Sequence, residues 1–186
     1  MILALDISTS MTGFAVVDRD GVVRVHGCVD LRKEKSFVAK VNIAKTEILL
    51  AIEGYAIETL AVEKNLQAFR RGFSSASTLD SLARFNGALS YAVASTVCAP
   101  LFNLDVNEVR RKLGIKIQKE KICGLPTKEQ VKRGLDGVLA ESGQKIQWGT
   151  KVLKSGPRKG LEVIADGVYD EVDAIVVGLA YLKMHA

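Results

Sequence analysis

The sequence predicts an α/β fold, in which a mixed five-stranded sheet (an antiparallel meander plus parallel strands) is flanked by helices. Three observations support this prediction. Short apolar runs bounded by turn-forming residues alternate with segments of helical period. Asp20-Gly21, a tight-turn signal, joins two of the apolar runs near the N-terminus. The 186 residues are enough for one core and contain no internal repeat, so we expect a single domain over 1–186.

The N-terminal segment predicts three consecutive strands. Ile2 to Leu5 is a short apolar run typical of a buried central strand, and it ends at Asp6. Phe14 to Val17 is a second apolar run, and the Asp20-Gly21 turn leads from it into Val22 to Val29. These three strands are expected to form the antiparallel meander.

Helical and strand patterns alternate through the rest of the chain. The expected elements are a helix over 36–53, a strand over 56–63, a helix over 79–93, a strand over 101–104, a helix over 108–113, a helix over 127–139 and a buried helix over 172–182. Gly54 and Pro100 stop the first two helices, and Thr127 is the expected N-cap of a later one. Lys116 to Lys121 predicts an irregular basic stretch.

Composition and cysteine spacing exclude several classes of protein. Hydrophobic residues make up 48% and charged residues 25%, as in ordinary globular domains. The three cysteines are far apart and form no CxxC pair, which argues against a disulfide framework or a structural zinc site. The sequence shows neither a signal peptide nor an uninterrupted apolar span. We therefore expect a cytoplasmic protein, in a bacterium or an infected host cell, with no membrane partner.

The positive charge is concentrated in one part of the chain. The net charge is +5, yet residues 108–160 contain 14 Lys and Arg against 5 Asp and Glu. Within this part, residues 142–160 are polar, rich in Gly and Lys and without helical period, and they predict a basic loop or a small hairpin around Trp148. Such asymmetry favours a polyanionic partner such as nucleic acid, although a solvated basic surface would look the same.

Four acidic residues are candidates for a metal site. Asp6 and Glu63 each end a buried strand, and parallel neighbouring strands would bring them to the same edge of the sheet. Asp170 and Asp173 lie three residues apart at the start of the last helix and therefore share a face. If that helix crosses the sheet, the four carboxylates converge and repel one another unless cations neutralise them. Oxygen-only ligands suit two Mg²⁺ or Mn²⁺ ions about 4 Å apart, a centre for phosphodiester hydrolysis.

Aromatic and basic residues lie together in the segment that follows Glu63. The segment contains Phe69, Arg70, Arg71 and Phe73 around a Gly-Ser-Ser turn. Aromatic rings can stack on unpaired bases and arginines can contact phosphates. Alternatively, one phenylalanine packs in the core and the arginines are solvated.

The ordered set of motifs resembles the RuvC family of Holliday junction resolvases, within the RNase H-like superfamily. The matching pieces cover nearly the whole chain and are LALDIS…TG, LAVEKNLQAF, LARFNGAL, NLDVNEVRRKLGI, PTKEQV and YDEVDAIVVGLAYL. Each motif alone is weak, and the terminal D-x-x-D-A before an apolar helix is the most specific. The resemblance implies an RNase H-like nuclease domain.

This resemblance also implies an activity, a cofactor and partners. It implies a homodimer that cuts four-way or branched DNA symmetrically with Mg²⁺ or Mn²⁺, two ions in each active site. It assigns metal binding and catalysis to Asp6, Glu63, Asp170 and Asp173. It assigns DNA contacts to Phe69, Arg70 and Arg71 near the junction centre, and to Lys128 and Lys119 at the scissile phosphate.

Two features depart from the family pattern. The first motif is DIS where many bacterial members have Asp-Pro-Gly, so the turn after Asp6 is expected to differ. The stretch between PTKEQV and Asp170 is longer and contains the basic loop from Lys145 to Lys159. This divergence resembles bacteriophage or outlying members, some of which cut branched DNA more broadly.

Three other functions remain open at the level of sequence. One is a broader nuclease of the same superfamily acting on branched DNA or RNA. Another is a non-catalytic nucleic-acid-binding module of that fold, which the four intact acids argue against. An actin-like or sugar-kinase-like fragment would use Asp6, Thr9, Thr12 and Gly13 around a phosphate, but such proteins need a second domain.

Overall fold

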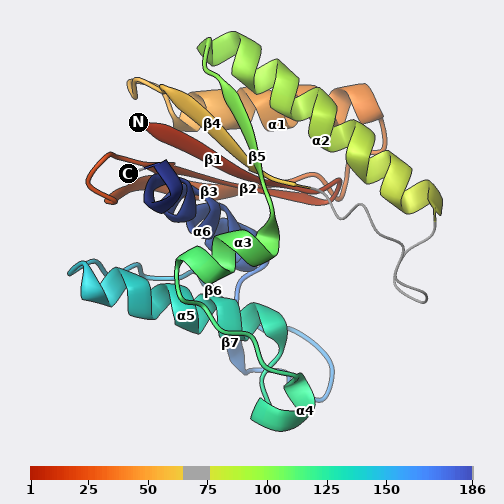
Figure 1. Ribbon diagram of the computed structural model, residues 1–186. Helices are drawn as coiled ribbons and strands as arrows, with labels where there is room; N and C mark the ends of the chain where they lie inside the picture. Colours follow the sequence, from red (N-terminus) through yellow and green to blue (C-terminus); the bar gives the residue numbers. More distant parts are fainter. Residues whose placement is uncertain (65–75, 186) are drawn as a thin grey trace.

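The computed structural model describes residues 1–64 and 76–185, and its centre is a mixed five-stranded sheet (Figure 1). The strands are β1 (Ile2–Ile7), β2 (Met11–Val17), β3 (Val23–Asp30), β4 (Thr59–Glu63) and β5 (Leu101–Leu104), in the spatial order β3-β2-β1-β4-β5. β1 pairs antiparallel with β2, and β2 pairs antiparallel with β3. β1 pairs parallel with β4, and β4 pairs parallel with β5. The predicted meander and parallel strands are confirmed.

Helices cover both faces of the sheet (Figure 1). The helices are α1 (Phe37–Ala51), α2 (Ala76–Val97), α3 (Val106–Lys112), α4 (Glu120–Cys123), α5 (Thr127–Glu141) and α6 (Val168–His185). α1 and α2 share one core with Leu3, Leu5 and Ile7 of β1. α3, α5 and α6 share the other core with Ile2 and Ala4 of the same strand. Because side chains alternate along a strand, β1 supplies both cores and is buried on both faces.

Helix α6 lies unusually close to the sheet because small residues line the contact. Gly178 of α6 faces Val17 and Ala4, so that a Cβ atom at position 178 would be 2.8 Å from Val17 Cγ2. At the other end of the helix, Gly13 of β2 faces the backbone of Asp170. This close approach fixes the helix start, with its acidic residues, against the strands.

Three details differ from the predicted elements or resolve an open choice. Of the loop and the hairpin predicted for residues 142–160, the structure shows the hairpin. Its first strand, β6 (Thr150–Val152), pairs antiparallel with β7 (Glu162–Ile164), which lies just beyond the predicted range. The basic stretch predicted to be irregular, Lys116 to Lys121, overlaps the start of α4, a single turn ended by Gly124 in the left-handed conformation. Pro126, not Thr127, is the N-cap of α5, and it caps with no side-chain hydrogen bond.

Among the helices described, none is both long and apolar enough to cross a bilayer.

We predict that Gly13→Ala is strongly destabilising, whereas Gly87→Ala is not. A Cβ atom at position 13 would be 1.9 Å from the Asp170 carbonyl oxygen, a backbone atom that cannot turn away. Overpacking against backbone should lower the free energy of unfolding by about 3 kcal/mol or more. Thermal and urea unfolding measure this loss.

Gly87→Ala is the matched control. Gly87 lies on the exposed side of α2 with open space around it, so alanine should raise the free energy of unfolding by about 0.5–1 kcal/mol. Equal stability of Gly13→Ala and the unmodified protein would show that α6 does not lie as close to β2 as described.

Candidate active site

Strand pairing brings Asp6 and Glu63 together at the carboxyl edge of the sheet. In the parallel ladder between β1 and β4, Leu5 pairs with Val62. The next residue on each strand is the acid, so Asp6 and Glu63 occupy neighbouring positions where the two strands end. This is the edge at which ligands gather in open α/β sheets.

Gly13 brings Asp170 to the same place. Gly13 pairs with Asp6 across β1 and β2, and it also lies against the backbone of Asp170 at the start of α6. Asp173 follows one turn later on the same face of the helix. The four predicted carboxylates therefore come from three elements, β1, β4 and α6, and the charges of the other three act on Asp6.

Burial raises the pKa of each of these carboxyl groups, and repulsion within the cluster adds to it for Asp6, Glu63 and Asp173. The pKa of Asp6 is well above its usual range, first because the group is desolvated and then because Glu63, Asp173 and Asp170 repel its negative charge. Desolvation, followed by the charge of Asp173, raises the pKa of Glu63 to about 7. Desolvation is also the main cause that raises the pKa values of Asp170 and Asp173. The cluster holds its negative charge at a considerable cost in free energy.

Asp18 shows how the same fold stabilises the negative charge of a buried carboxylate. Its side chain accepts hydrogen bonds from the backbone N–H groups of Asp20 (3.0 Å) and Val22 (2.8 Å) and pairs with Arg24. Although desolvation opposes it, these donors hold the pKa of Asp18 below its usual value. Within the described residues, the carboxylates of Asp6 and Glu63 accept no such hydrogen bonds. They are half-buried acids without hydrogen-bond donors, which favours a site for a cation.

Two basic side chains lie beside the acids, one of them not foreseen from the sequence. Lys128, at the start of α5, lowers the pKa values of Asp6, Asp170 and Asp173 by its positive charge. Arg110 of α3 was not singled out: its Nη2 atom is 3.8 Å from Asp173 Oδ1, and its charge lowers the pKa of Glu63. Among described residues, Arg110 Nε is buried with no hydrogen-bond partner.

The remaining predicted DNA contacts are not brought to this cluster. Lys119 is the N-cap of α4, and it is not among the charges that act on the four carboxylates. Its role stays a prediction. Phe69, Arg70 and Arg71 lie outside the described residues, so their predicted roles are untested.

The turn after Asp6 is closed by hydroxyl groups. Ser8 Oγ donates to the carbonyl oxygen of Met11 (2.6 Å) and accepts from the backbone N–H of Met11 (3.1 Å). Thr12 Oγ1 donates to the carbonyl oxygen of Ser8 (3.2 Å), and Lys40 donates to the carbonyl oxygen of Thr9. These bonds give the DIS motif a rigid turn that holds Asp6 at the strand end.

Polar contacts of Tyr169 and Glu171, the residues on either side of Asp170, fix the start of α6. His26 Nδ1 lies 2.6 Å from Glu171 Oε2, and the Tyr169 hydroxyl donates to Glu129 Oε2 at 3.2 Å. Lys128 Nζ lies 5.9 Å from the centre of the Tyr169 ring.

Burial and the surrounding acids raise the pKa of the Cys28 thiol to about 12, so this cysteine stays protonated and is no nucleophile.

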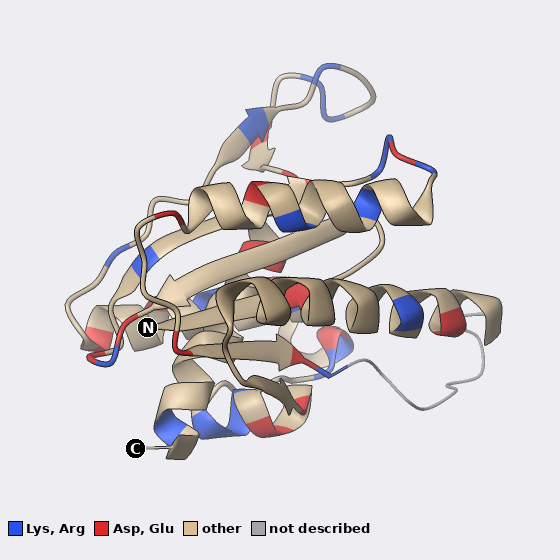
Figure 2. Cartoon of the chain, turned by 90° about the horizontal axis from the view of Figure 1, so that it is seen from above, with Lys and Arg blue, Asp and Glu red and all other residues tan. Residues whose placement is uncertain are grey.

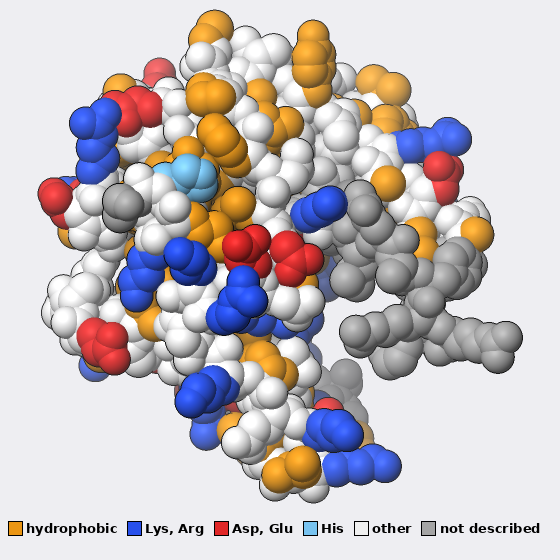
Figure 3. Space-filling view, in the orientation of Figure 1, with side chains coloured by type: hydrophobic (Ala, Val, Ile, Leu, Met, Phe, Trp, Pro, Cys, Tyr) orange, Lys and Arg blue, Asp and Glu red, His pale blue; other side chains and the backbone are white. Residues whose placement is uncertain are grey.

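The donor set fits hard divalent cations. All four side chains are carboxylates, as Mg²⁺ and Mn²⁺ prefer, and their repulsion is relieved by positive charge. Within residues 1–64 and 76–185, no three His, Cys, Asp or Glu side chains already form a metal cage. The carboxylates approach one another without closing into a preformed site. Figure 3 shows acidic side chains near the middle of one face, with Lys and Arg side chains beside and below them.

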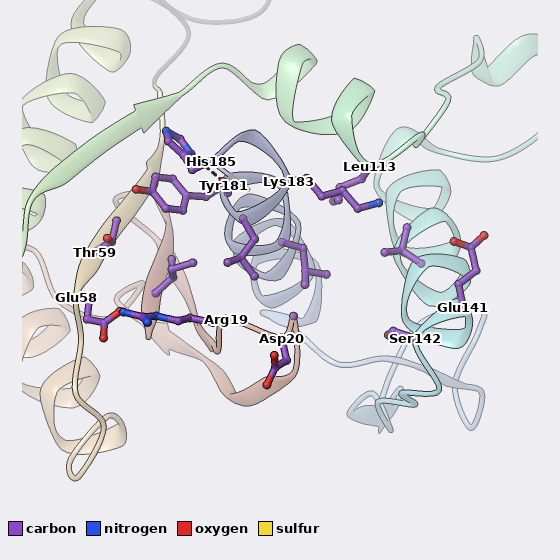
Figure 4. Close-up of a pocket in the computed structure, with 15 residues that line it drawn as sticks. Arg19, Asp20, Glu58, Thr59, Leu113, Glu141, Ser142, Tyr181, Lys183 and His185 are labelled. Atoms are coloured by element: carbon purple, nitrogen blue, oxygen red, sulfur yellow. Dashed lines mark hydrogen bonds and ion pairs between the residues drawn. The ribbon is translucent and has the colours of Figure 1, made fainter.

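A separate cavity lies at the opposite edge of the sheet. Its volume is about 680 Å³, and its lining includes Ile2 and Thr59 at the starts of β1 and β4 (Figure 4). Arg19 donates to Glu58 across one wall at 3.0 Å. None of the four acids lines it. It is therefore not the site of the chemistry that the carboxylates support.

Comparison with known proteins identifies the fold. No protein-family model and no curated protein matches the sequence. The structure is similar to Thermus thermophilus RuvC in complex with a Holliday junction substrate, with TM-score 0.65 and 17% identity over 99% of this chain and 93% of that one. A second T. thermophilus RuvC structure gives TM-score 0.62 and 19% identity, over 99% and 94% of the chains. The yeast mitochondrial Holliday junction resolvase Ydc2 gives a TM-score of 0.53 and 11% identity, over 98% of this chain and 77% of that one. The chain thus has the RuvC-like form of the RNase H-like fold.

We predict that the metal-free protein loses stability as the pH rises. The folded state raises the carboxyl pKa values. Between about pH 4.5 and pH 7 the folded protein therefore still holds protons that the unfolded chain has already released. In EDTA, the free energy of unfolding should fall by on the order of 1–3 kcal/mol from pH 5 to pH 8. Millimolar Mg²⁺ should restore it at pH 8.

Glu63→Gln is the control for this pH dependence. The variant removes one repelling charge, so its stability should fall less between pH 5 and pH 8 in EDTA. A fall as large as that of the unmodified protein would contradict the assignment of Glu63 to the repelling cluster. Thermal unfolding across the pH range supplies both curves.

We predict different effects for two adjacent arginines of α3. Arg110→Gln removes a charge that neutralises Asp173 and Glu63 and should lower the free energy of unfolding at pH 8 by about 1–2 kcal/mol. Arg111→Gln removes an exposed charge 3.9 Å from Glu108 and should change it by less than about 0.5 kcal/mol. Equal effects in denaturant unfolding would place Arg110 outside the cluster.

Proposed function

We propose that this chain is a structure-specific DNA endonuclease that resolves four-way junctions by metal-dependent phosphodiester hydrolysis. The observation that carries the proposal is the grouping of Glu63, Asp170 and Asp173 around Asp6. The fold shared with RuvC, which is bound to a Holliday junction in one of the structures, supports DNA as the substrate.

The four carboxylates would hold Mg²⁺, with Mn²⁺ as a substitute and two ions in each site. The bound ions would supply an activated water and neutralise the charge that develops on the phosphate. The protein's own part is positioning: two strand ends and one helix start fix the acids relative to one another.

Lys128 and Arg110 would contact the scissile phosphate. Arg110 Nη2 lies 3.8 Å from Asp173 Oδ1, and the positive charge of Lys128 lowers the pKa values of Asp6 and Asp173. A phosphate bound there would receive charge-assisted hydrogen bonds on its non-bridging oxygens. Arg110 suits this role because its Nη2 atom already lies 3.8 Å from Asp173 Oδ1 and 21% of its side chain remains exposed.

The proposal includes a homodimer. A four-way junction has two symmetry-related strands to cut, and two copies of one active site related by a twofold axis would match them. Analytical ultracentrifugation of the free protein measures the oligomeric state directly. Such an enzyme would act in the cytoplasm, on bacterial or phage DNA.

A gel assay defines the substrate. A labelled immobile four-way junction is compared with a linear duplex, a Y-fork and an RNA–DNA hybrid, each with Mg²⁺ or EDTA. Paired symmetric nicks in the junction alone, dependent on metal, support a resolvase. Cleavage of forks as well indicates a broader debranching nuclease, and cleavage of the hybrid indicates an RNase H activity.

We predict that Asp6→Asn abolishes cleavage and leaves junction binding intact. The change removes a metal ligand, whereas the basic surface is untouched, so cleavage should fall by at least about 10³-fold. Binding in EDTA, followed by fluorescence anisotropy, should stay within about twofold.

Asp20→Asn supplies the matched control, because Asp20 lies at the opposite edge of the sheet and lines the separate cavity. It should cut at the normal rate. Normal cleavage by Asp6→Asn would mean that the reaction takes place elsewhere.

A further inference from the structure

The hairpin formed by β6 and β7 presents a basic tip. Lys154, Arg158 and Lys159 lie in the tip, are exposed, and form no ion pair within the described part of the chain. Residues 153–160 contain no acidic residue. Figure 2 shows this two-stranded element with its Lys and Arg residues standing out from the rest of the chain. Three unneutralised cations are thus concentrated on a projecting element.

Backbone hydrogen bonds order the tip. Gly160 N–H donates to the carbonyl oxygen of Leu153 (2.9 Å), and Leu153 N–H donates to that of Leu161 (3.0 Å). Lys159 N–H donates to the carbonyl oxygen of Gly156 (3.1 Å). Gly156 and Gly160 adopt positive φ, which other residues rarely do. The tip is a defined turn, so its backbone holds the three basic residues on one short segment.

Trp148 anchors the root of the hairpin to the body of the protein. Its Nε1–H donates to Asp136 Oδ1 of α5 at 2.8 Å, and its ring centre lies 5.7 Å from that of His26 on β3. Lys132 Nζ lies 5.6 Å from the ring centre and also pairs with Asp136 (2.9 Å). One side chain therefore joins the hairpin to α5 and to the edge of the sheet.

Asp166, which follows β7, supplies a second set of contacts between the hairpin and the rest of the protein. Asp166, just after β7, pairs with Lys151 of β6 and with Arg32 after β3 (3.2 Å). Ala165 N–H donates to the carbonyl oxygen of Gly149 (3.0 Å). α6 begins at Val168, so the anchored hairpin leads directly into the helix that carries Asp170 and Asp173. The tip is held in a fixed relation to the carboxylate cluster.

We infer that the β6–β7 hairpin binds the phosphate backbone of a duplex arm, beyond the site of cleavage. This inference rests on the proposed function and adds to it the surface that holds an arm. About five residues at about 3.3 Å each place the tip roughly 17 Å from the hairpin root. A duplex advances about 3.4 Å per base pair, so the length of the hairpin matches about five base pairs of an arm.

The test neutralises the tip. In the variant Lys154→Gln/Arg158→Gln/Lys159→Gln, junction affinity is measured in EDTA by fluorescence anisotropy between about 50 and 200 mM salt. If each side chain contacts one phosphate, the slope of log K against log salt becomes shallower by about 2.7. The affinity at low salt should fall at least about tenfold. The residues are exposed, so the fold is retained, and circular dichroism checks this.

The matched control removes the same charge elsewhere. Arg19→Gln/Lys45→Gln/Lys183→Gln takes three cations from the opposite edge of the sheet, from α1 and from the end of α6. Its salt slope should stay within about 0.5 of the unmodified value, since no phosphate is lost. A slope as shallow as that of the tip variant would mean that net charge, rather than the hairpin, governs binding, and would overturn the inference.

Hydroxyl-radical footprinting places the contact. The unmodified protein should protect a stretch of one arm away from the cleavage point, and the tip variant should lose only this protection. If the unmodified protein binds junctions and the tip variant keeps its slope and footprint, the hairpin inference fails and the proposed function stands. If the unmodified protein binds no DNA, both fail.

Discussion

The arrangement of this molecule depends on the contact between helix α6 and strand β2 at Gly13. That glycine pairs with Asp6 in the sheet, and the space of its missing side chain is filled by the backbone of Asp170. A single close approach thus places a carboxylate from the central strand next to carboxylates from the last helix. Parallel pairing of β1 with β4 then adds Glu63. Local sheet geometry, rather than any long loop, assembles the site.

The assembled carboxylates work against the stability of the fold. Their pKa values are raised because burial and like charges disfavour ionisation, and few protein donors compensate. Asp18, with two backbone donors and an arginine, shows that the same chain can stabilise a buried acid where stability is the only requirement. Groups that are destabilised in this way in a folded protein mark a place where a cation is expected to bind.

Much of the fold could be predicted from residues alone because the patterns are local. Apolar runs gave the five strands, and the carboxyl ends of two of them gave Asp6 and Glu63. Asp170 and Asp173 followed from their spacing on a helix. α4 was missed because it is a single turn, too short to show a helical period. Thr127 was expected as a cap, but Pro126 occupies the capping position because its extended backbone precedes the first turn.

Arg110 could not be identified from local patterns. Arg110, Arg111 and Lys112 are consecutive cations, and their order alone does not distinguish the one that faces the acids. The phase of the helix decides: Val109 and Leu113 are buried, and Arg110 lies beside the acids with 21% of its side chain exposed, against 78% for Arg111. That phase could have been read from the apolar positions, but the partner of Arg110 depends on tertiary packing. The hairpin anchor at Trp148 likewise involves residues more than 100 positions apart.

The central claim is that Asp6, Glu63, Asp170 and Asp173 bind divalent cations together. Crystals soaked in Mn²⁺ and measured near the manganese absorption edge test it most directly. The structure predicts anomalous difference density among these four side chains, with the carboxylates drawn inward around it. Ordered carboxylates without such density at millimolar Mn²⁺, or Mn²⁺ bound only elsewhere on the protein, would contradict the claim.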